Sequence, residues 1–149
     1  VYRAARGDVP EGEYTIPIGE ARVVREGRGM TVISWGAMVH EAETAAAEAQ
    51  DLDVELIDLR TLWPLDIETV TRSVRKTGRC AIVQEAPRTC GFAAEISALV
   101  QERCFTSLEA PIARITGWDT PFPYTLENDY LPLAPRILRS LRELKAYEP

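Results

Sequence analysis

Short apolar runs alternate with longer amphipathic segments along most of the chain. Runs typical of buried strands lie at residues 31–35, 54–59, 80–84 and 112–116. Each is followed by a segment with apolar residues at helical spacing, over residues 37–50, 66–78, 92–100 and 134–147. Strands that alternate with helices predict a mostly parallel sheet with helices on both faces, joined by right-handed crossovers.

The first thirty residues carry a weaker pattern. A short strand is predicted at residues 21–25, and Gly27-Arg28-Gly29 can turn the chain into the strand at 31–35. Since two strands joined by a tight turn pair antiparallel, we expect this strand to lie antiparallel at an edge of the sheet. Residues 1–20 show neither periodicity and predict an extended lead-in that lies on something else.

The chain of 149 residues has the length of one domain. We therefore expect a single domain over residues 1–149, with the lead-in at 1–20 and the α/β unit at 21–149. Because the chain begins with Val1 and not with Met, we expect it to be a piece of a longer protein.

Composition narrows the choice of partners. The net charge is −6 and the 17 Lys and Arg residues are scattered, which argues against nucleic acid, since phosphate binding needs clustered cations. No apolar run approaches the ~20 residues that cross a bilayer, and no signal-peptide pattern is present. Cys80, Cys90 and Cys104 form no CxxC pair, which fits a reducing compartment. We expect a cytoplasmic protein without nucleic-acid or membrane partners.

A ligand of such a sheet would bind at the carboxyl ends of the parallel strands. These ends offer Ser34-Trp35-Gly36, Asp58-Leu59-Arg60, Gln84-Glu85-Ala86-Pro87-Arg88 and Gly117-Trp118-Asp119-Thr120. Neither the GxGxxG nor the GxxxxGK[ST] phosphate-binding pattern occurs. His40, the only histidine, lies inside a predicted helix without a framed nucleophile, and we interpret it as a helix-surface or interface residue. We predict no catalytic, cofactor-binding or metal-binding residue.

Two pairs of opposite charge lie at this edge. Asp58 and Arg60 stand at the end of one strand, and we expect an ion pair that orders the turn. Glu85 and Arg88 are three residues apart, and the guanidinium group of Arg88 suits a carboxylate or a phosphate. The second pair can bind a ligand, a partner chain or each other, and we favour a partner surface.

The segment Trp118-Asp119-Thr120-Pro121-Phe122-Pro123-Tyr124 holds three aromatic residues and two prolines. A monomer rarely leaves such an apolar surface in water, and Trp and Tyr are prominent at protein interfaces. Packing beneath a loop of the same domain is the alternative. We favour a subunit interface.

Five motifs follow one another in order along nearly the whole chain. They are Val1-Tyr2-Arg3-Ala4-Ala5, Tyr14-Thr15-Ile16-Pro17-Ile18-Gly19, Val54-Glu55-Leu56-Ile57-Asp58-Leu59-Arg60-Thr61-Leu62, Glu85-Ala86-Pro87-Arg88-Thr89 with Gly91-Phe92, and Gly117-Trp118-Asp119-Thr120-Pro121-Phe122-Pro123. Together they resemble the C-terminal part of the β subunit of thiamine-diphosphate-dependent 2-oxo acid dehydrogenases, most closely the branched-chain (2-oxoisovalerate) type.

The resemblance implies a transketolase C-terminal-domain-like fold, which is a three-layer α/β/α sandwich around a five-stranded, mostly parallel sheet with one antiparallel edge strand. It implies that thiamine diphosphate and magnesium are held by other parts of the complete enzyme, so that this chain binds no cofactor and is inactive alone. The complete enzyme would oxidatively decarboxylate 2-oxo acids and acylate lipoyl groups.

The resemblance also implies partners. They are an α subunit and a second β subunit in an α2β2 assembly, and a dihydrolipoyl acyltransferase whose small basic binding domain docks near Glu109. Acidic residues at that place suit a basic partner. Our candidate interface residues are Glu85, Arg88, Phe92, Glu109, Trp118, Asp119, Phe122 and Tyr124.

The chain departs from the family that it resembles at two positions. Many members of that family have His where this chain has Gln84, and Gly where it has Cys90. Gln84 cannot titrate, and Cys90 restricts the backbone of the turn before Gly91. Two other functions stay open. One is a stand-alone flavodoxin-like domain that binds a small molecule at the carboxyl edge. The other is the C-terminal domain of another thiamine-diphosphate enzyme, such as a pyruvate dehydrogenase β subunit, a transketolase or a deoxyxylulose phosphate synthase.

Overall fold

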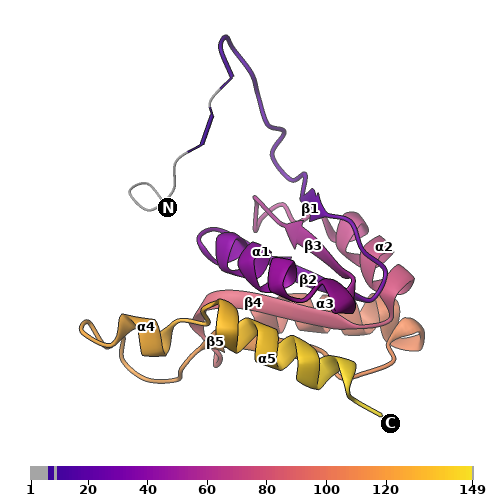
Figure 1. The fold of residues 1–149 in the computed structure, drawn as a ribbon. Helices are drawn as coiled ribbons and strands as arrows, with labels where there is room; N and C mark the ends of the chain where they lie inside the picture. Colours follow the sequence, from indigo (N-terminus) through magenta and orange to yellow (C-terminus); the bar gives the residue numbers. More distant parts are fainter. Residues whose placement is uncertain (1–6, 9, 149) are drawn as a thin grey trace.

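A computed structural model describes residues 7, 8 and 10–148 of the protein, and the motif Val1-Tyr2-Arg3-Ala4-Ala5 lies outside these residues. The centre of the structure is a five-stranded sheet in the order β1-β3-β2-β4-β5 (Figure 1). Strands β2 to β5 run parallel, and β1 pairs antiparallel with β3 at one edge. The predicted fold class is confirmed. The strands are β1 (Arg22–Arg25), β2 (Met30–Ser34), β3 (Val54–Asp58), β4 (Cys80–Pro87) and β5 (Ala113–Gly117).

Helices cover both faces of the sheet. Helices α1 (Met38–Glu48) and α5 (Ala134–Lys145) lie on one face, and α2 (Ile67–Thr77) and α3 (Ala93–Cys104) lie on the other. Successive residues of a strand pack into the cores on opposite faces of the sheet. Val32 packs toward α1 and α5, whereas Ile33 packs toward α2 and α3. This two-sided burial explains why the strands read as continuous apolar runs. The remaining elements are η1 (Gln50–Leu52), η2 (Phe105–Ser107) and α4 (Glu127–Tyr130).

Helix α2 begins and ends where its sequence predicts. The Asp66 carboxylate accepts hydrogen bonds from the backbone N–H groups of Thr69 and Ala21, both at 3.0 Å. Burial opposes ionisation of Asp66, but these hydrogen bonds outweigh it and lower the pKa of the carboxyl group. Gly78 ends the helix with a φ of 71°, a left-handed conformation that glycine adopts without strain.

The predicted pairing of the strand at 21–25 with the strand at 31–35 is wrong, because β3 lies between β1 and β2. Gly27 and Gly29 do not form a hairpin turn. A Cβ atom at either position would overlap the backbone of residues 52–54, over which the connection passes. The N–H groups of Arg28 and Gly29 donate to Asp53 O at 3.1 and 2.8 Å. Glycine is needed here for close approach, and the connection carries β1 to the far side of β3.

One charged side chain is buried beside this crossing. The side chain of Glu55 is 4% exposed and forms an ion pair with Lys76 on α2. It also accepts a hydrogen bond from the Gly27 N–H group at 3.3 Å. Burial alone would raise the pKa of Glu55, but the hydrogen bonds from Lys76, Ser73 and Gly27 lower it overall. Glu55 therefore ties β3, α2 and the β1–β2 connection together as a carboxylate.

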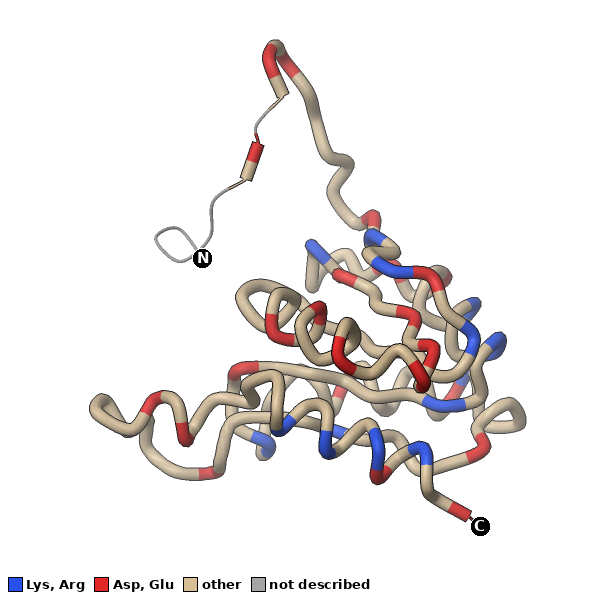
Figure 2. Tube along the Cα trace, in the orientation of Figure 1, with Lys and Arg blue, Asp and Glu red and all other residues tan. Residues whose placement is uncertain are grey.

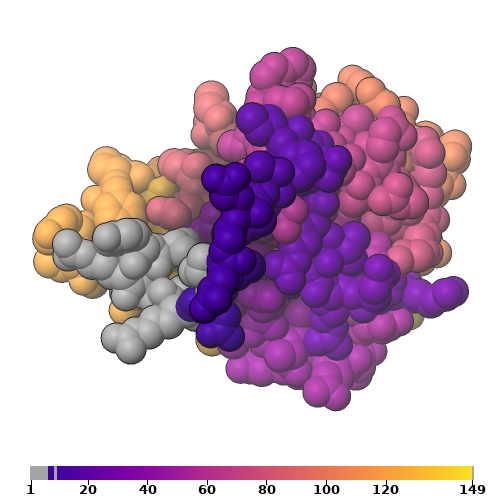
Figure 3. All heavy atoms as spheres, turned by 90° about the horizontal axis from the view of Figure 1, so that it is seen from above, coloured from indigo at the N-terminus to yellow at the C-terminus, as the bar shows by residue number. Residues whose placement is uncertain are grey.

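The lead-in forms neither helix nor strand from residue 10 to residue 20. Figure 1 shows it extending away from the domain beyond β1, and Figure 3 shows it as a narrow indigo band of atoms nearest the viewer. It is anchored where the Gly19 N–H group donates to Thr61 Oγ1 at 3.2 Å. Tyr14, Ile16 and Ile18 are exposed, so these side chains bury little surface on the described domain. What the lead-in lies on stays a prediction.

Candidate functional site

The carboxyl ends of β2 and β4 form the point where the connections diverge. Helix α1 leaves β2 on one face of the sheet, and α3 leaves β4 on the opposite face. Open α/β sheets bind ligands in the crevice that such a divergence creates. A crevice of about 390 Å³ lies there, which we call the Glu85 crevice. Its lining residues are Trp35, Gly36, Ala37, Glu85, Ala86, Phe122 and Tyr130.

Glu85 supplies the carboxylate of this crevice. It is exposed, and it takes part in none of the ion pairs or side-chain hydrogen bonds found among residues 7, 8 and 10–148. Glu85 and Arg88 therefore do not bind each other, which removes one of the three interpretations of this pair. The choice between a ligand and a partner chain depends on the surroundings of Glu85.

Arg88 is engaged with β5 instead. Its Nη1 donates to Arg114 O at 3.0 Å, and Arg114 Nη1 donates to Arg88 O at 3.4 Å. Two residues further along β5, Arg136 Nη2 donates to Thr116 O. β5 is an edge strand, and carbonyl groups two residues apart point to the same side. Guanidinium groups thus occupy acceptors that an added strand would need, a common protection of sheet edges.

Gln84 locks the corner between β4 and α3. It is 1% exposed, its Nε2 donates to Ala86 O at 3.2 Å and Pro87 O at 2.7 Å, and its Oε1 accepts from the Ala93 N–H group at 2.8 Å. An amide is the side chain that donates twice and accepts at the same place. A Cβ atom on Gly91 would overlap this amide, so glycine is required beside it. These contacts fix the path of the chain on which Glu85 and Arg88 lie.

The backbone of the corner is strained at Cys90, and Thr89 bonds to the segment from Trp118 to Tyr124, which we call the aromatic loop. Cys90 has a φ of 59°, and its side chain is exposed. Cys90 thus adopts a left-handed conformation that glycine would adopt more readily, and its effect on the freedom of the turn stays a prediction. Asp119 accepts from the Thr89 N–H group at 2.8 Å and from Thr89 Oγ1 at 2.7 Å. These hydrogen bonds lower the pKa of Asp119, which is the carboxylate that holds the loop to the corner.

The aromatic loop packs partly on its own domain. Trp118 Nε1 donates to Asp129 O at 2.9 Å, and the guanidinium group of Arg136 lies 3.9 Å from the centre of the Trp118 ring. Phe122 packs edge-on against the buried Tyr130, with ring centres 5.0 Å apart.

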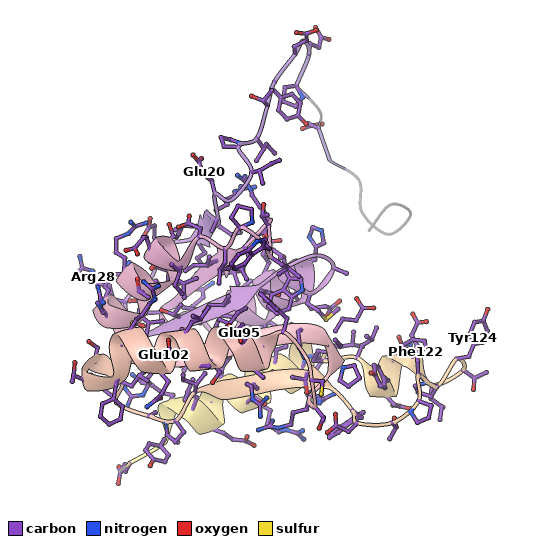
Figure 4. All side chains as sticks on the ribbon, turned by 180° about the vertical axis from the view of Figure 1, so that it is seen from behind. Glu20, Arg28, Glu95, Glu102, Phe122 and Tyr124 are labelled. Atoms are coloured by element: carbon purple, nitrogen blue, oxygen red, sulfur yellow. The ribbon has the colours of Figure 1, made fainter. Side chains whose placement is uncertain are left out.

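Much apolar surface of the loop nevertheless faces solvent: Trp118 and Phe122 are each 51% exposed and Tyr124 is 90% exposed. Figure 4 shows Phe122 and Tyr124 at one end of the domain, away from Glu95 and Glu102 on α3. We call Trp118, Phe122 and Tyr124 the aromatic rim.

Two other candidate interface residues lie elsewhere. Phe92 is half-buried against the α2–α3 core and meets Trp35 edge-on, with ring centres 6.1 Å apart. Glu109 lies at the amino ends of the strands, where its Oε2 accepts from Arg79 Nη1 at 2.6 Å. The Glu109 N–H group donates to Gly78 O at 2.8 Å. Glu109 therefore also helps to hold the end of α2.

The remaining predictions have mixed outcomes. His40 is exposed on α1 and pairs with Glu43 at 3.4 Å, so it is a helix-surface residue as expected. The predicted ion pair of Asp58 and Arg60 is wrong. Asp58 Oδ1 accepts from the Arg60 backbone N–H group at 3.0 Å, while Arg60 has a φ of 55° and is exposed. Burial raises the pKa of Cys80 to about 12, which makes it an inert core thiol.

Tyr130, which forms part of the crevice wall, was not predicted from the sequence. Tyr130 lies in a helix of four residues, too short to give a periodic signal. Its only sequence signal was its place in a long loop rich in aromatic residues. Within the described ranges, no three His, Cys, Asp or Glu side chains converge as metal ligands, and no helix is long and apolar enough to cross a membrane.

The chain matches the family model described as "Transketolase, C-terminal domain" over residues 19–137. It is 56% identical to the 2-oxoisovalerate dehydrogenase subunit beta of Pseudomonas aeruginosa over 129 residues, which cover 87% of this chain and 37% of that protein. It is 50% identical to the mitochondrial 2-oxoisovalerate dehydrogenase subunit beta of Dictyostelium discoideum, over 99% of this chain and 40% of that protein.

The chain is also similar to a subunit of a pyruvate dehydrogenase, and it shares its fold with a solved structure. The pyruvate dehydrogenase E1 component subunit beta of Staphylococcus epidermidis is 51% identical over 89% of this chain and 42% of that protein. Among solved structures, the "Split gene transketolase, inactive beta4 tetramer" aligns with a TM-score of 0.76 and 22% identity, over 99% of this chain and 48% of that chain. The chain thus spans about two-fifths of the length of the curated relatives it matches.

Proposed function

The chain belongs to the transketolase C-terminal domain family, and from this premise we propose that it is the non-catalytic C-terminal domain of a 2-oxo acid dehydrogenase β subunit. The identities to β subunits of the 2-oxoisovalerate type support this assignment. The complete enzyme would oxidatively decarboxylate a branched 2-oxo acid and acylate a lipoyl group. This domain would pair with an α subunit and a second β subunit and would help to dock the acyltransferase.

The observation that carries the proposal is the aromatic rim beside the carboxyl ends of the strands. In the described part of the chain this edge joins an unpaired carboxylate to exposed aromatic surface, which suits contact with protein. Thiamine diphosphate and magnesium need a phosphate-binding site and oxygen ligands. The described residues bring no set of metal-ligating side chains together, and the sequence contains neither the GxGxxG nor the GxxxxGK[ST] phosphate-binding pattern. The residues present therefore do not fit this cofactor, and we assign them no step of the reaction.

Cofactor binding tests the non-catalytic role. Calorimetric titration of the 149-residue chain with thiamine diphosphate and magnesium should give no binding heat at micromolar concentrations. The same titration of the complete α2β2 enzyme is the positive control. Micromolar binding by this chain alone would sink the proposal.

Subunit pairing tests the role in assembly. In the complete β subunit expressed with its α subunit, the double change of Phe122→Ser and Tyr124→Ser should weaken assembly by about tenfold or more, because it removes interface anchors. Analytical ultracentrifugation measures the dissociation. Phe105→Ser, at a 68% exposed side chain near the opposite end of the sheet, is the matched control and should leave assembly unchanged. Equal behaviour of the two variants would count against the rim as an interface.

Docking of the acyltransferase tests the assignment of Glu109. Glu109→Lys should weaken the docking of the acyltransferase's binding domain to the complete enzyme, because it reverses a charge. Since Glu109 also holds Arg79, Glu109→Gln serves as the control for fold: it keeps an acceptor for Arg79 while removing the charge. Unchanged affinity for Glu109→Lys at physiological salt would contradict the assignment.

The pyruvate type is the second candidate, and the identity to a pyruvate dehydrogenase subunit favours it. Steady-state assays of the complete enzyme with 2-oxoisovalerate and with pyruvate distinguish the two. A higher kcat/KM with 2-oxoisovalerate is expected.

A further inference from the structure

The Glu85 crevice combines one carboxylate with aromatic walls. We infer that it is a socket for the cationic side chain of an arginine or lysine presented by a partner subunit. The inference rests on the proposed role in assembly and names what the partner inserts. Glu85 and the rings of Trp35 and Phe122 all line the crevice.

The chemistry of the walls suits such a side chain along its whole length. The aliphatic stem of arginine or lysine packs on apolar surface while its charged end stays solvated or paired. The stem would lie against Phe122 and Trp35, and the charged end would meet the carboxylate of Glu85. Aromatic faces also attract cations directly.

The surroundings carry the complementary charge. The loop from residue 117 to residue 132 contains Asp119, Glu127 and Asp129 and no Lys or Arg. Figure 2 shows red segments and no blue around α4, whereas the blue segments of the C-terminal region lie on α5. An acidic and aromatic surface favours a partner that presents a cation flanked by apolar residues.

The two arginines of the domain near the crevice hydrogen-bond to backbone carbonyl groups and not to Glu85. Arg136 stacks on Trp118 and donates to Thr116 O, and Arg88 donates to Arg114 O. Neither takes part in an ion pair with Glu85. The carboxylate thus stays available to a group from outside the described residues.

A side chain fits the crevice better than a free small molecule. Small-molecule sites enclose most of their ligand and converge several polar groups on it. Among its lining residues Glu85 carries the charge, Trp35 and Tyr130 each have one polar side-chain atom, and the wall continues into the exposed aromatic rim. A charged anchor surrounded by aromatic surface is the arrangement of an interface hot spot.

Nuclear magnetic resonance of the ¹⁵N-labelled 149-residue chain tests the chemistry of the socket. The probe is N-acetyl-arginine-N-methylamide, and its citrulline counterpart is the neutral control of nearly the same shape. The arginine probe should shift the amide signals of Gly36, Ala37 and Ala86 and the indole signal of Trp35. The citrulline probe should bind at least about fivefold more weakly, since it loses the cation's contacts.

Glu85→Gln should reduce binding of the arginine probe to the level of the citrulline probe. Glu127→Gln, at an exposed acid of the same loop outside the crevice lining, should leave it unchanged. Absence of shifts at the crevice, or equal binding of the two probes, would overturn the inference. So would equal effects of the two glutamine variants.

The assembled enzyme separates this inference from the proposed function. In the complete β subunit expressed with its α subunit, Glu85→Lys should raise the dissociation constant of the assembly by about tenfold or more. If the Phe122 and Tyr124 change weakens assembly but Glu85→Lys does not, the socket is refuted and the proposed function stands. If neither change affects assembly, both fail.

Discussion

Replacing Gln84 by Met removes three hydrogen bonds while keeping a side chain of similar length and volume. Gln84 is buried at 1% exposure, and Ala93, whose N–H group it accepts, is 0% exposed. That N–H group would stay buried without an acceptor, which costs about 1–3 kcal/mol. Ala86 is exposed and Pro87 is half-buried, so water can replace the amide as the donor to their carbonyl groups. Each of these two lost hydrogen bonds therefore costs no more than about 1.5 kcal/mol. We expect a loss of about 2–4 kcal/mol in the free energy of unfolding.

Replacing Gln84 by Glu gives a second, independent readout. The new carboxylate keeps the acceptor for Ala93 but places a negative charge against Ala86 O and Pro87 O, where the amide donated. Burial and these carbonyls favour the protonated acid, so its pKa in the folded state should rise above its unfolded value of about 4.3. Relative to the unsubstituted chain, the loss of stability in the variant should therefore be smallest below that value and should grow as the pH rises through the folded pKa of the new acid.

Urea unfolding of the 149-residue chain between pH 4 and pH 8 measures both effects. The same two substitutions at Gln101, which is exposed on α3, are the matched controls and should change stability by less than about 0.5 kcal/mol. A loss below about 1 kcal/mol for Gln84→Met would refute the claim that the hydrogen bonds of Gln84 stabilise the folded chain. A Gln84→Glu variant with no more pH dependence than Gln101→Glu would refute the account of the buried charge.

Three further predictions concern single positions. Cys90→Gly should stabilise the chain by about 0.5–1 kcal/mol in thermal unfolding, because the strain of a left-handed residue that it removes exceeds the backbone entropy that glycine loses on folding. Cys90→Ala keeps this strain and should give no gain. Gly91→Ala should cost about 1–3 kcal/mol, because its methyl group overlaps a buried amide, while Gly7→Ala, with no atom near, should be neutral. Stability should fall as the pH drops below the ordinary glutamate value of 4.5 and through the lowered pKa of Glu55, and Glu55→Gln should flatten this part of the curve, measured by urea unfolding. A curve equally steep in the variant would assign the acid loss to other carboxylates.

The order of helices and parallel strands was predictable because burial on both faces leaves a strong pattern. Val32 and Ile33 enter different cores, yet both must be apolar, so the strand reads as one run. The partner of β1 was not predictable in the same way. Gly27 and Gly29 have the composition of a turn, and only the position of residues 52–54 shows that they are needed for close approach. Local sequence carries no record of a contact made with a distant strand.

The candidate site was predictable in place but not in contacts. The carboxyl edge followed from the parallel sheet, and Glu85, Arg88 and the aromatic loop were found there. The ion pair expected between Asp58 and Arg60 failed because the left-handed conformation of Arg60 brings its N–H group, not its guanidinium group, to the carboxylate. Such a conformation is uncommon for a residue other than glycine, so sequence spacing gave no reason to expect it.

The corner at the end of β4 shows how the contacts of each residue limit its function. Gln84 hydrogen-bonds to three backbone groups. Thr89 hydrogen-bonds to Asp119, and Arg88 hydrogen-bonds to a backbone carbonyl group of the edge strand β5. Each of these side chains has an internal partner that explains its position without any outside molecule. Glu85 has none among the described residues, and it lines a crevice at the divergence of the sheet connections. Since this exposed carboxylate has no partner among the described residues, it is the part of this corner from which an external contact follows.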